Sequence, residues 1–187
     1  MRIIAGDWRG RKLLAPEGDS TRPITDRVKQ SVFDILTPRI AGSRVFDCFA
    51  GTGSLGLEAL SRGAADAVFF ESDASAVARL RKNISEFKAD DRGRVVAVDL
   101  FRWFENQSGS KVRADIVFLD PPYRFLTERS ADLKRLAKTV AERHLAAGGV
   151  VVLRRSMRDD LDLPPLQRYD LRAYGSMAVE LLTRPES

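Results

Sequence analysis

The chain has 187 residues, 44% of them hydrophobic, which suits one globular domain with a continuous core. A single cysteine, Cys48, excludes an internal disulfide. Together with one histidine, His144, it cannot assemble the usual zinc sites. The N-terminal residues carry charge too early for a signal peptide, and no apolar run approaches the roughly 20 residues of a spanning helix. We therefore expect a monomeric cytoplasmic protein without a metal and without membrane contact.

The formal net charge of +5 indicates a nucleic-acid partner only if the basic residues share one surface. They gather partly near the N-terminus, at Arg2, Arg9, Arg11, Lys12, Arg22, Arg27 and Lys29. A scattered, solvated surface would explain the same charges equally well. If these basic residues lie near a catalytic loop, the nucleic-acid interpretation is favoured.

The N-terminal region predicts an extension over residues 1–25 of one domain, with the core over residues 26–187. Residues 2–5 and 11–14 flank a turn and predict a small β-hairpin. A loop over residues 19–25 then leads into a helix after Asp26. The apolar side of that helix holds Val28, Val32, Ile35 and Leu36.

From residue 44 onward, short β-branched runs alternate with helical patterns, which predicts a parallel sheet wound with helices. The expected strands are 44–48, 67–71, 94–98, 115–120 and 149–154. The expected helices are 55–62, 74–88, a short one from Phe101, and 128–145. Two last runs separated by Gly175-Ser176 predict an antiparallel hairpin at residues 167–174 and 177–183.

A glycine-rich loop follows the first expected strand. Gly51, Gly53 and Gly56 satisfy the G-x-G-x-x-G pattern of a nucleotide-binding turn, and Glu71 lies about 20 residues further on, where it can hold ribose hydroxyls. The pattern alone is weak evidence. A nicotinamide-dependent oxidoreductase and a tight strand-to-helix turn both remain alternatives.

Acidic residues near the ends of the expected strands help to distinguish a dinucleotide from a cofactor with a methionine moiety. Asp47 suits the cationic amino group of a methionine moiety better than an anionic pyrophosphate. Asp99 is placed to accept a hydrogen bond from an adenine amino group, although a helix cap explains it equally well. Asp73 is better explained as a helix N-cap than as a ribose ligand.

The segment Asp120-Pro121-Pro122-Tyr123 ends a buried apolar run and is the most specific motif in the chain. Two prolines fix the loop, which presents a carboxylate, a carbonyl and an aromatic ring at one point. An exocyclic amine on a heteroaromatic ring is a poor nucleophile, because its lone pair is delocalised. Two acceptors on its N–H bonds favour pyramidalisation and aim that lone pair at a methyl donor.

At this point the sequence resembles the amino-methyltransferases whose signature is [Asp/Asn]-Pro-Pro-[Tyr/Phe]. More narrowly it resembles the RsmD family of bacterial 16S rRNA guanine-N2 methyltransferases, over nearly the whole chain. The matching segments are Arg2-Ile-Ile-Ala-Gly, Arg9-Gly-Arg11, Thr21-Arg-Pro23, Thr25-Asp-Arg27, Phe33-Asp-Ile-Leu36, Asp47 to Gly63, Glu71-Ser-Asp73 and Asp120-Pro-Pro-Tyr123. Family members commonly have threonine directly after the Arg-Pro pair, whereas Ile24 intervenes here, so the role of that loop hydroxyl is open.

The resemblance implies a Rossmann-like class I methyltransferase fold with a seven-stranded, mostly parallel sheet, a C-terminal antiparallel hairpin and a small N-terminal β-hairpin. It implies S-adenosylmethionine as cofactor, held by Asp47, Phe49, Gly51, Thr52, Gly53, Glu71, Ser72, Asp99, Leu100 and Asp120. The catalytic residues it implies are Asp120, Pro121 and Tyr123.

The implied partner is 16S rRNA, most naturally in a partly assembled 30S subunit. We expect the RNA to contact Arg2, Trp8, Arg9, Arg11, Lys12, Arg22 and Arg124, with phosphate contacts that position rather than specify. Trp8 could stack on an unpaired base, although capping of the core is at least as plausible.

Two other classes share part of this pattern. Adenine-N6 DNA methyltransferases use the same catalytic loop but need an added recognition region, for which 187 residues leave little room. A non-catalytic RNA-binding factor on the same fold is disfavoured, because the cofactor and catalytic motifs are both intact.

Overall fold

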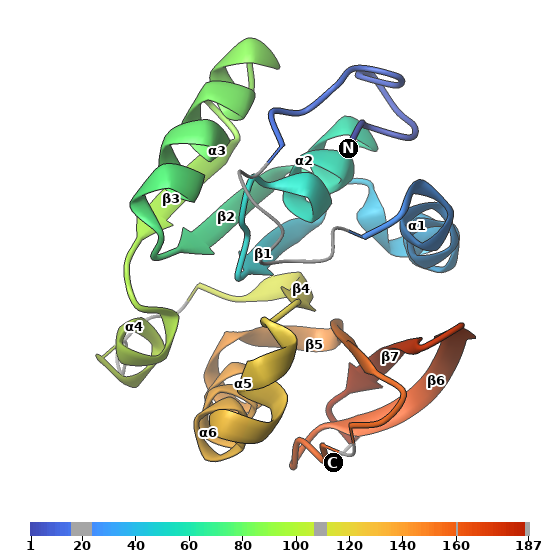
Figure 1. The fold of residues 1–187 in the computed structure, drawn as a ribbon, viewed down its shortest axis with the longest axis vertical. Helices are drawn as coiled ribbons and strands as arrows, with labels where there is room; N and C mark the ends of the chain where they lie inside the picture. The colour runs from blue at the N-terminus through green and yellow to red at the C-terminus, as the bar shows by residue number, and fades with distance from the viewer. Residues whose placement is uncertain (16–23, 107–111, 160, 186–187) are drawn as a thin grey trace.

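The computed structural model describes residues 1–15, 24–106, 112–159 and 161–185. Its seven strands are β1 Arg44–Cys48, β2 Asp66–Glu71, β3 Gly93–Ala97, β4 Ala114–Leu119, β5 Leu145–Ser156, β6 Gln167–Tyr174 and β7 Met177–Thr183. They form one sheet in the order β3-β2-β1-β4-β5-β7-β6 (Figure 1).

Strands β1 to β5 pair in parallel, and the hairpin of β6 and β7 joins β5 in antiparallel fashion. The predicted fold class, a mostly parallel seven-stranded sheet with a C-terminal antiparallel hairpin, is confirmed. The first five strands follow the order of a dinucleotide-binding fold, in which the direction of winding switches between β1 and β4. Ligands of such sheets bind beyond the carboxyl ends of the strands at this switch point.

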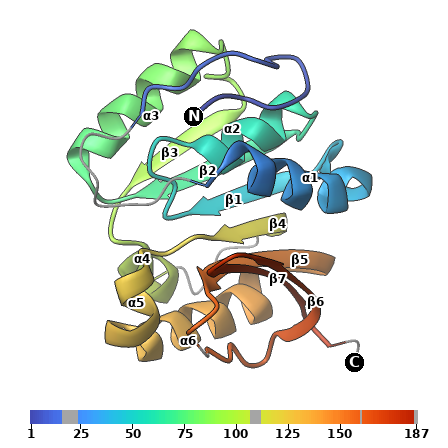
Figure 2. The same cartoon turned by 45° about the vertical axis from the view of Figure 1, so that its right-hand side comes forward.

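The helices are α1 Asp26–Ile40, α2 Ser54–Ser61, α3 Ala74–Glu86, α4 Leu100–Asn106, α5 Tyr123–Glu128, α6 Ser130–Thr139 and a short π-helix, Val140–His144. Figure 2 shows α1, α2 and α3 on one face of the sheet and α4, α5 and α6 on the other. Each face buries its own apolar cluster, because the central strands are covered on both sides. Among the described residues, no helix has both the length and the apolar character needed to cross a membrane.

The helix predicted after Asp26 is α1. Thr25 caps its N-terminus by accepting a hydrogen bond from the backbone N–H of Val28 at 3.3 Å. Its apolar side packs into the core, as the spacing of Val28, Val32 and Leu36 predicts.

The helices after β4 differ from the prediction at their start. The helix predicted over residues 128–145 covers residues 130–144, as α6 and the π-helix that continues it. It starts two residues late, because Arg129 leaves the helical conformation and separates α5 from α6. After α6 the chain passes through the π-helix, and β5 already begins at Leu145. The helix α5 was missed, because the two prolines indicate a rigid loop although Pro122 is the N-cap residue of this helix.

The N-terminal segment, residues 1–15, is less regular than the predicted hairpin. An antiparallel bridge joins Arg2 to Lys12, and backbone hydrogen bonds join Ile3 to Arg11 and Gly10, and Leu13 to Met1. The two arms therefore pair as predicted, although they form no regular strand ladder. The segment crosses the outer side of α2 and α3 (Figure 1). Ile3, Trp8 and Leu13 of this segment share the apolar cluster of α1 to α3, so it belongs to the core rather than to a separate unit.

A buried carboxylate on α2 holds this segment in place. Glu58 is 0% exposed and accepts hydrogen bonds from the backbone N–H groups of Ile4, at 2.8 Å, and Ala5, at 3.0 Å. It also pairs with Lys29 of α1 at 3.1 Å and with Arg62 at 2.8 Å. Four donors therefore compensate one buried charge.

We predict that Glu58→Gln lowers the free energy of unfolding by about 3–5 kcal/mol, because it leaves the ammonium of Lys29 buried without its partner charge. Urea denaturation measures the change. Glu86→Gln, at an exposed position of α3, serves as the control and should change stability by at most about 0.5 kcal/mol. Equal effects of the two substitutions would contradict the role given to Glu58.

Candidate active site

The glycine loop between β1 and α2 is built around Asp47, whose side chain is 1% exposed. Its Oδ2 atom accepts a hydrogen bond from the backbone N–H of Gly56 at 2.8 Å, at the start of α2. The cap residue Gly53 has a φ of 86° and no side chain for this purpose, so Asp47 supplies the capping oxygen from β1. Gly51, with a φ of 56°, borders open space, because a Cβ added there would meet nothing within 4 Å. Thr52 of this loop is buried.

Glu71, at the end of β2, organises the same loop. Its Oε2 atom accepts from the N–H of Gly51, and its Oε1 atom accepts from the N–H groups of Ser72 and Asp73, each at 2.8 Å. An ionised carboxylate has about four acceptor positions, so capacity for ribose hydroxyls remains. Asp73 caps α3 by accepting from Ala76 N–H at 2.7 Å, as the sequence predicts.

Asp99 lies at the end of the next strand and caps α4. Its Oδ1 atom accepts from the N–H groups of Phe101, at 2.9 Å, and Arg102, at 3.2 Å. The capping alternative is thus realised, and the contact to adenine stays a prediction for this exposed carboxylate. Leu100 beside it is buried.

The loop after β4 presents Asp120 next to an arginine that the sequence analysis missed. Arg154 of β5 donates from Nε to Oδ1 of Asp120 at 2.5 Å, and its guanidinium lies 5.6 Å from the centre of the Tyr123 ring. Pro121 is buried, and Pro122 caps the helix that begins at Tyr123. The sequence signal for Arg154 is its place directly after the apolar run at residues 150–153.

Three phenylalanines from the loops after β1, β3 and β4 form an aromatic cluster, which was not predicted from the sequence. Phe49, Phe101 and Phe125 follow β1, β3 and β4 and lie with ring centres 5.8 to 6.3 Å apart. Arg129 covers this cluster, with its guanidinium 4.0 Å from the centre of the Phe101 ring. The sequence signal was one phenylalanine shortly after each of three strand ends.

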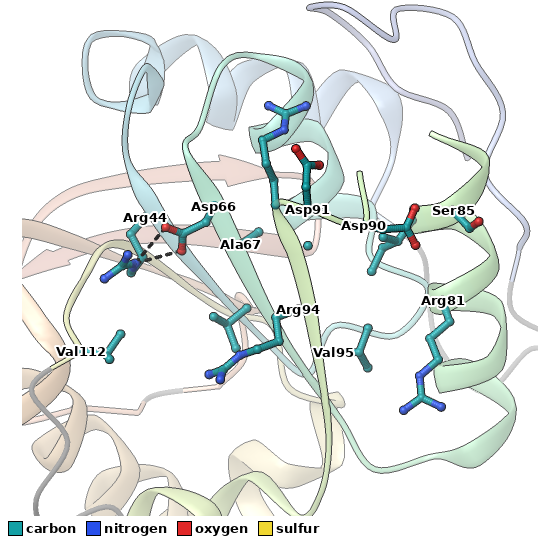
Figure 3. A pocket seen from close by; sticks show the side chains of 14 residues that line it. Arg44, Asp66, Ala67, Arg81, Ser85, Asp90, Asp91, Arg94, Val95 and Val112 are labelled. Atoms are coloured by element: carbon teal, nitrogen blue, oxygen red, sulfur yellow. Dashed lines mark hydrogen bonds and ion pairs between the residues drawn. The ribbon is translucent and has the colours of Figure 1, made fainter. Parts of the chain in front are cut away.

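A cavity of about 830 Å³ lies elsewhere, at the amino ends of β2 and β3. Figure 3 shows Arg44 paired with Asp66 at its edge, with Arg81 and Arg94 nearby. None of the residues predicted to bind the cofactor lines it. In the described ranges, no group of three histidine, cysteine, aspartate or glutamate side chains could hold a metal ion.

The predicted RNA-contacting residues differ in availability. Arg9, Lys12 and Arg124 are exposed. Arg2 pairs with Asp26 at 2.7 Å, and Arg11 donates to the carbonyl of Glu86 at 2.6 Å. The predicted residue Arg22 lies outside the described residues.

Trp8 is 9% exposed and packs on Phe87, with ring centres 5.1 Å apart. The guanidinium of Arg92 lies 5.5 Å from the centre of the Trp8 ring. Trp8 therefore caps the core, which is the alternative that the sequence left open, and it leaves little surface for a base.

The family model described as Conserved hypothetical protein 95 matches residues 1–183. The chain belongs to this family. Ribosomal RNA small subunit methyltransferase D of Escherichia coli K12 is 47% identical over 124 residues, which are 66% of this chain and 61% of that protein. The Haemophilus influenzae protein of the same name is 42% identical over 134 residues, 71% of this chain and 69% of that protein. The predicted membership of the RsmD family is confirmed.

A solved structure agrees with this family. The yhhF protein of Escherichia coli superposes with a TM-score of 0.83 at 35% identity, over 98% of this chain and 97% of that chain. The alignment with the Escherichia coli K12 relative spans only 61% of the length of that protein.

The buried Asp47 of this family member yields a stability prediction. Burial raises the pKa of Asp47 well above its ordinary value, and the Gly56 N–H acts in the opposite direction. In the unfolded chain the group ionises near pH 4, at about 3.9. Its contribution to stability is therefore complete below that pH and is lost as the pH rises through the folded pKa.

Asp47→Asn keeps an oxygen acceptor for Gly56 and removes the charge. We expect its urea midpoint, relative to that of the wild type, to increase from pH 4 to pH 7. Asp91→Asn, at an exposed position, should show no such trend. A difference between Asp47→Asn and the wild type that is constant with pH would contradict the assignment.

Proposed function

We propose that this chain transfers the methyl group of S-adenosylmethionine to the exocyclic N2 amino group of a guanine in 16S rRNA, within an assembling 30S subunit. The observation that carries the proposal is the meeting of two loops at the switch point of the sheet. Asp47 lies near the carboxyl end of β1, just before the glycine loop. Asp120 directly follows β4, the strand that pairs with β1.

The donor set of the first loop fits this cofactor. Asp47 supplies a carboxylate for the ammonium group of the methionine moiety, and Glu71 supplies one for ribose. The open space at Gly51 lets backbone approach the ligand closely. When bound, S-adenosylmethionine would supply an electrophilic sulfonium methyl group, which the amine nitrogen attacks with its lone pair while S-adenosylhomocysteine leaves.

The second loop fits a planar amine. Asp120 and the carbonyl of Pro121 accept hydrogen bonds from the two N–H groups of the target amine, which aims its lone pair at the methyl donor. The half-buried Tyr123 offers a ring face to a base taken out of its stack, a displacement that requires a few kcal/mol when the base was paired. Catalysis is positioning and electrostatic support, without a covalent enzyme intermediate.

The RNA substrate is supported by the curated relatives, whose names state a small-subunit ribosomal RNA methyltransferase. The catalytic loop itself fits the N6 amine of adenine as well as the N2 amine of guanine. The choice of guanine as the target base therefore rests on the family resemblance. The Asp120-Pro-Pro-Tyr123 motif has no use in a nicotinamide oxidoreductase, and titration of S-adenosylhomocysteine against NAD separates these two functions. Mapping of labelled methyl groups on small-subunit RNA from a deletion strain tests the target base.

We predict that Asp120→Ala abolishes methyl transfer to that RNA and still binds S-adenosylhomocysteine. The substitution removes an acceptor for the amine and leaves the glycine loop unchanged. Single-turnover transfer and calorimetry measure the two properties, and a thermal melt verifies folding. Undiminished transfer would rule out the role given to Asp120.

The exposed basic residues of the N-terminal segment generate a second prediction. Arg9→Ala combined with Lys12→Ala should weaken RNA binding and reduce the slope of log K against log salt by about 1–2, because each phosphate contact contributes about 0.7–0.9. Lys134→Ala, exposed on α6 across the sheet, is the control. An unchanged slope in the double variant would identify this surface as merely solvated.

A further inference from the structure

Arg154 and Asp120 occupy matching positions on neighbouring strands. The parallel pairing of β4 with β5 ends at Leu119 and Leu153. Asp120 and Arg154 are the residues that directly follow this last pair. Side chains alternate along a strand, and Val152 packs in the cluster of α1 to α3. Arg154 therefore lies on the same face of the sheet as that cluster.

The ion pair between them is mostly shielded from water. The side chain of Arg154 is 11% exposed and that of Asp120 is 17% exposed, with 2.5 Å between Nε and Oδ1. The same guanidinium approaches the ring of Tyr123. One side chain from β5 thus contacts both ends of the Asp120 to Tyr123 loop.

We propose that Arg154 is a positioning residue for Asp120, which fixes Oδ1 so that Oδ2 and the Pro121 carbonyl are presented to the target amine. This inference rests on the proposed function. Arg154 takes no part in the bond changes of methyl transfer, and it acts only through the carboxylate that it holds.

Arg154 also affects the charge state of Asp120. Burial raises the pKa of Asp120, and Arg154 opposes that rise through its charge and its hydrogen bond. Among the described residues, the other ionisable groups that face this pair include Asp47 from β1 and Tyr123 from the loop itself. A carboxyl group that kept its proton would offer an O–H donor in place of an acceptor for the amine. Arg154 therefore favours the ionised form that the loop requires.

The adjacent arginine provides a matched control. Arg155 points to the other face of the strand and pairs with Glu180 at 2.5 Å, with side-chain exposures of 9% and 5%. Its removal breaks an equally buried ion pair of β5 without touching Asp120. A loss that reflects only the stability of β5 would appear in both variants.

The direct test is a carboxyl NMR titration of protein labelled with ¹³C at the aspartate side chains, with the Asp120 signal assigned through Asp120→Asn. Arg154→Gln should raise the pKa of Asp120 by about one to three units, because an opposite charge at this distance lowers a carboxyl pKa by that amount. Arg154→Lys should restore part of the shift, and Arg155→Gln should leave the pKa unchanged. A pKa in Arg154→Gln within a few tenths of a unit of the wild type would overturn the proposal.

The functional test is the pH profile of single-turnover methyl transfer. Arg154→Gln should move the acidic limb to higher pH and lower the rate at pH 7 about tenfold, while the affinity for S-adenosylhomocysteine stays constant. Arg154→Lys should lie in between, because it keeps the charge and loses the planar donor geometry. A loss equal at all pH values, or one matched by Arg155→Gln, would overturn the positioning role. If the wild-type protein transfers no methyl group to small-subunit RNA, the proposed function fails, and the NMR titration still tests the link between Arg154 and Asp120.

Discussion

The compensation of one fully buried charge, Glu58, determines how the N-terminal half of the chain is assembled. A carboxylate without partners costs several kcal/mol in an apolar interior, so its donors must come together for the fold to be stable. Those donors come from the N-terminal segment, from α1 and from α2 itself. Lys29 also donates to Ser54 at 3.2 Å, at the first residue of α2. The network that anchors the N-terminal segment therefore also fixes the helix end beside the glycine loop.

The same requirement operates at the carboxyl edge of the sheet, with a different class of donor. Asp47, Glu71 and Asp99 each accept backbone N–H groups from the loop or helix that follows a strand. These acids thus shape the loops in which they lie, before any ligand binds. Asp120 differs, since its short hydrogen bond comes from a side chain, Arg154 on β5. Its orientation depends on a neighbouring strand rather than on its own loop.

Periodicity predicted the sheet well, because the central strands are buried on both faces and appear as compact apolar runs, such as residues 116–119. It missed the short helix α5, which a single residue, Arg129, separates from α6 without a glycine or proline to mark the break. The acids of the site could be found because they follow strands. Arg154 could not, since its partner is 34 positions away and only the register of β4 with β5 brings the two together. The burial of Trp8 likewise depends on Phe87, a contact between distant segments.

The pairing of Asp120 with Arg154 also bears on where the proton of the target amine goes. A carboxylate that shares one oxygen with a guanidinium is a weaker base than a free one, because protonation would give up that charge-assisted hydrogen bond. An aromatic amine that has just accepted a methyl group is cationic and strongly acidic, so water can remove its proton. The geometry thus favours Asp120 as a hydrogen-bond acceptor that orients the amine over a general base. Under the proposed function, catalysis would then depend on how rigidly β4 and β5 hold the side chains of Asp120 and Arg154.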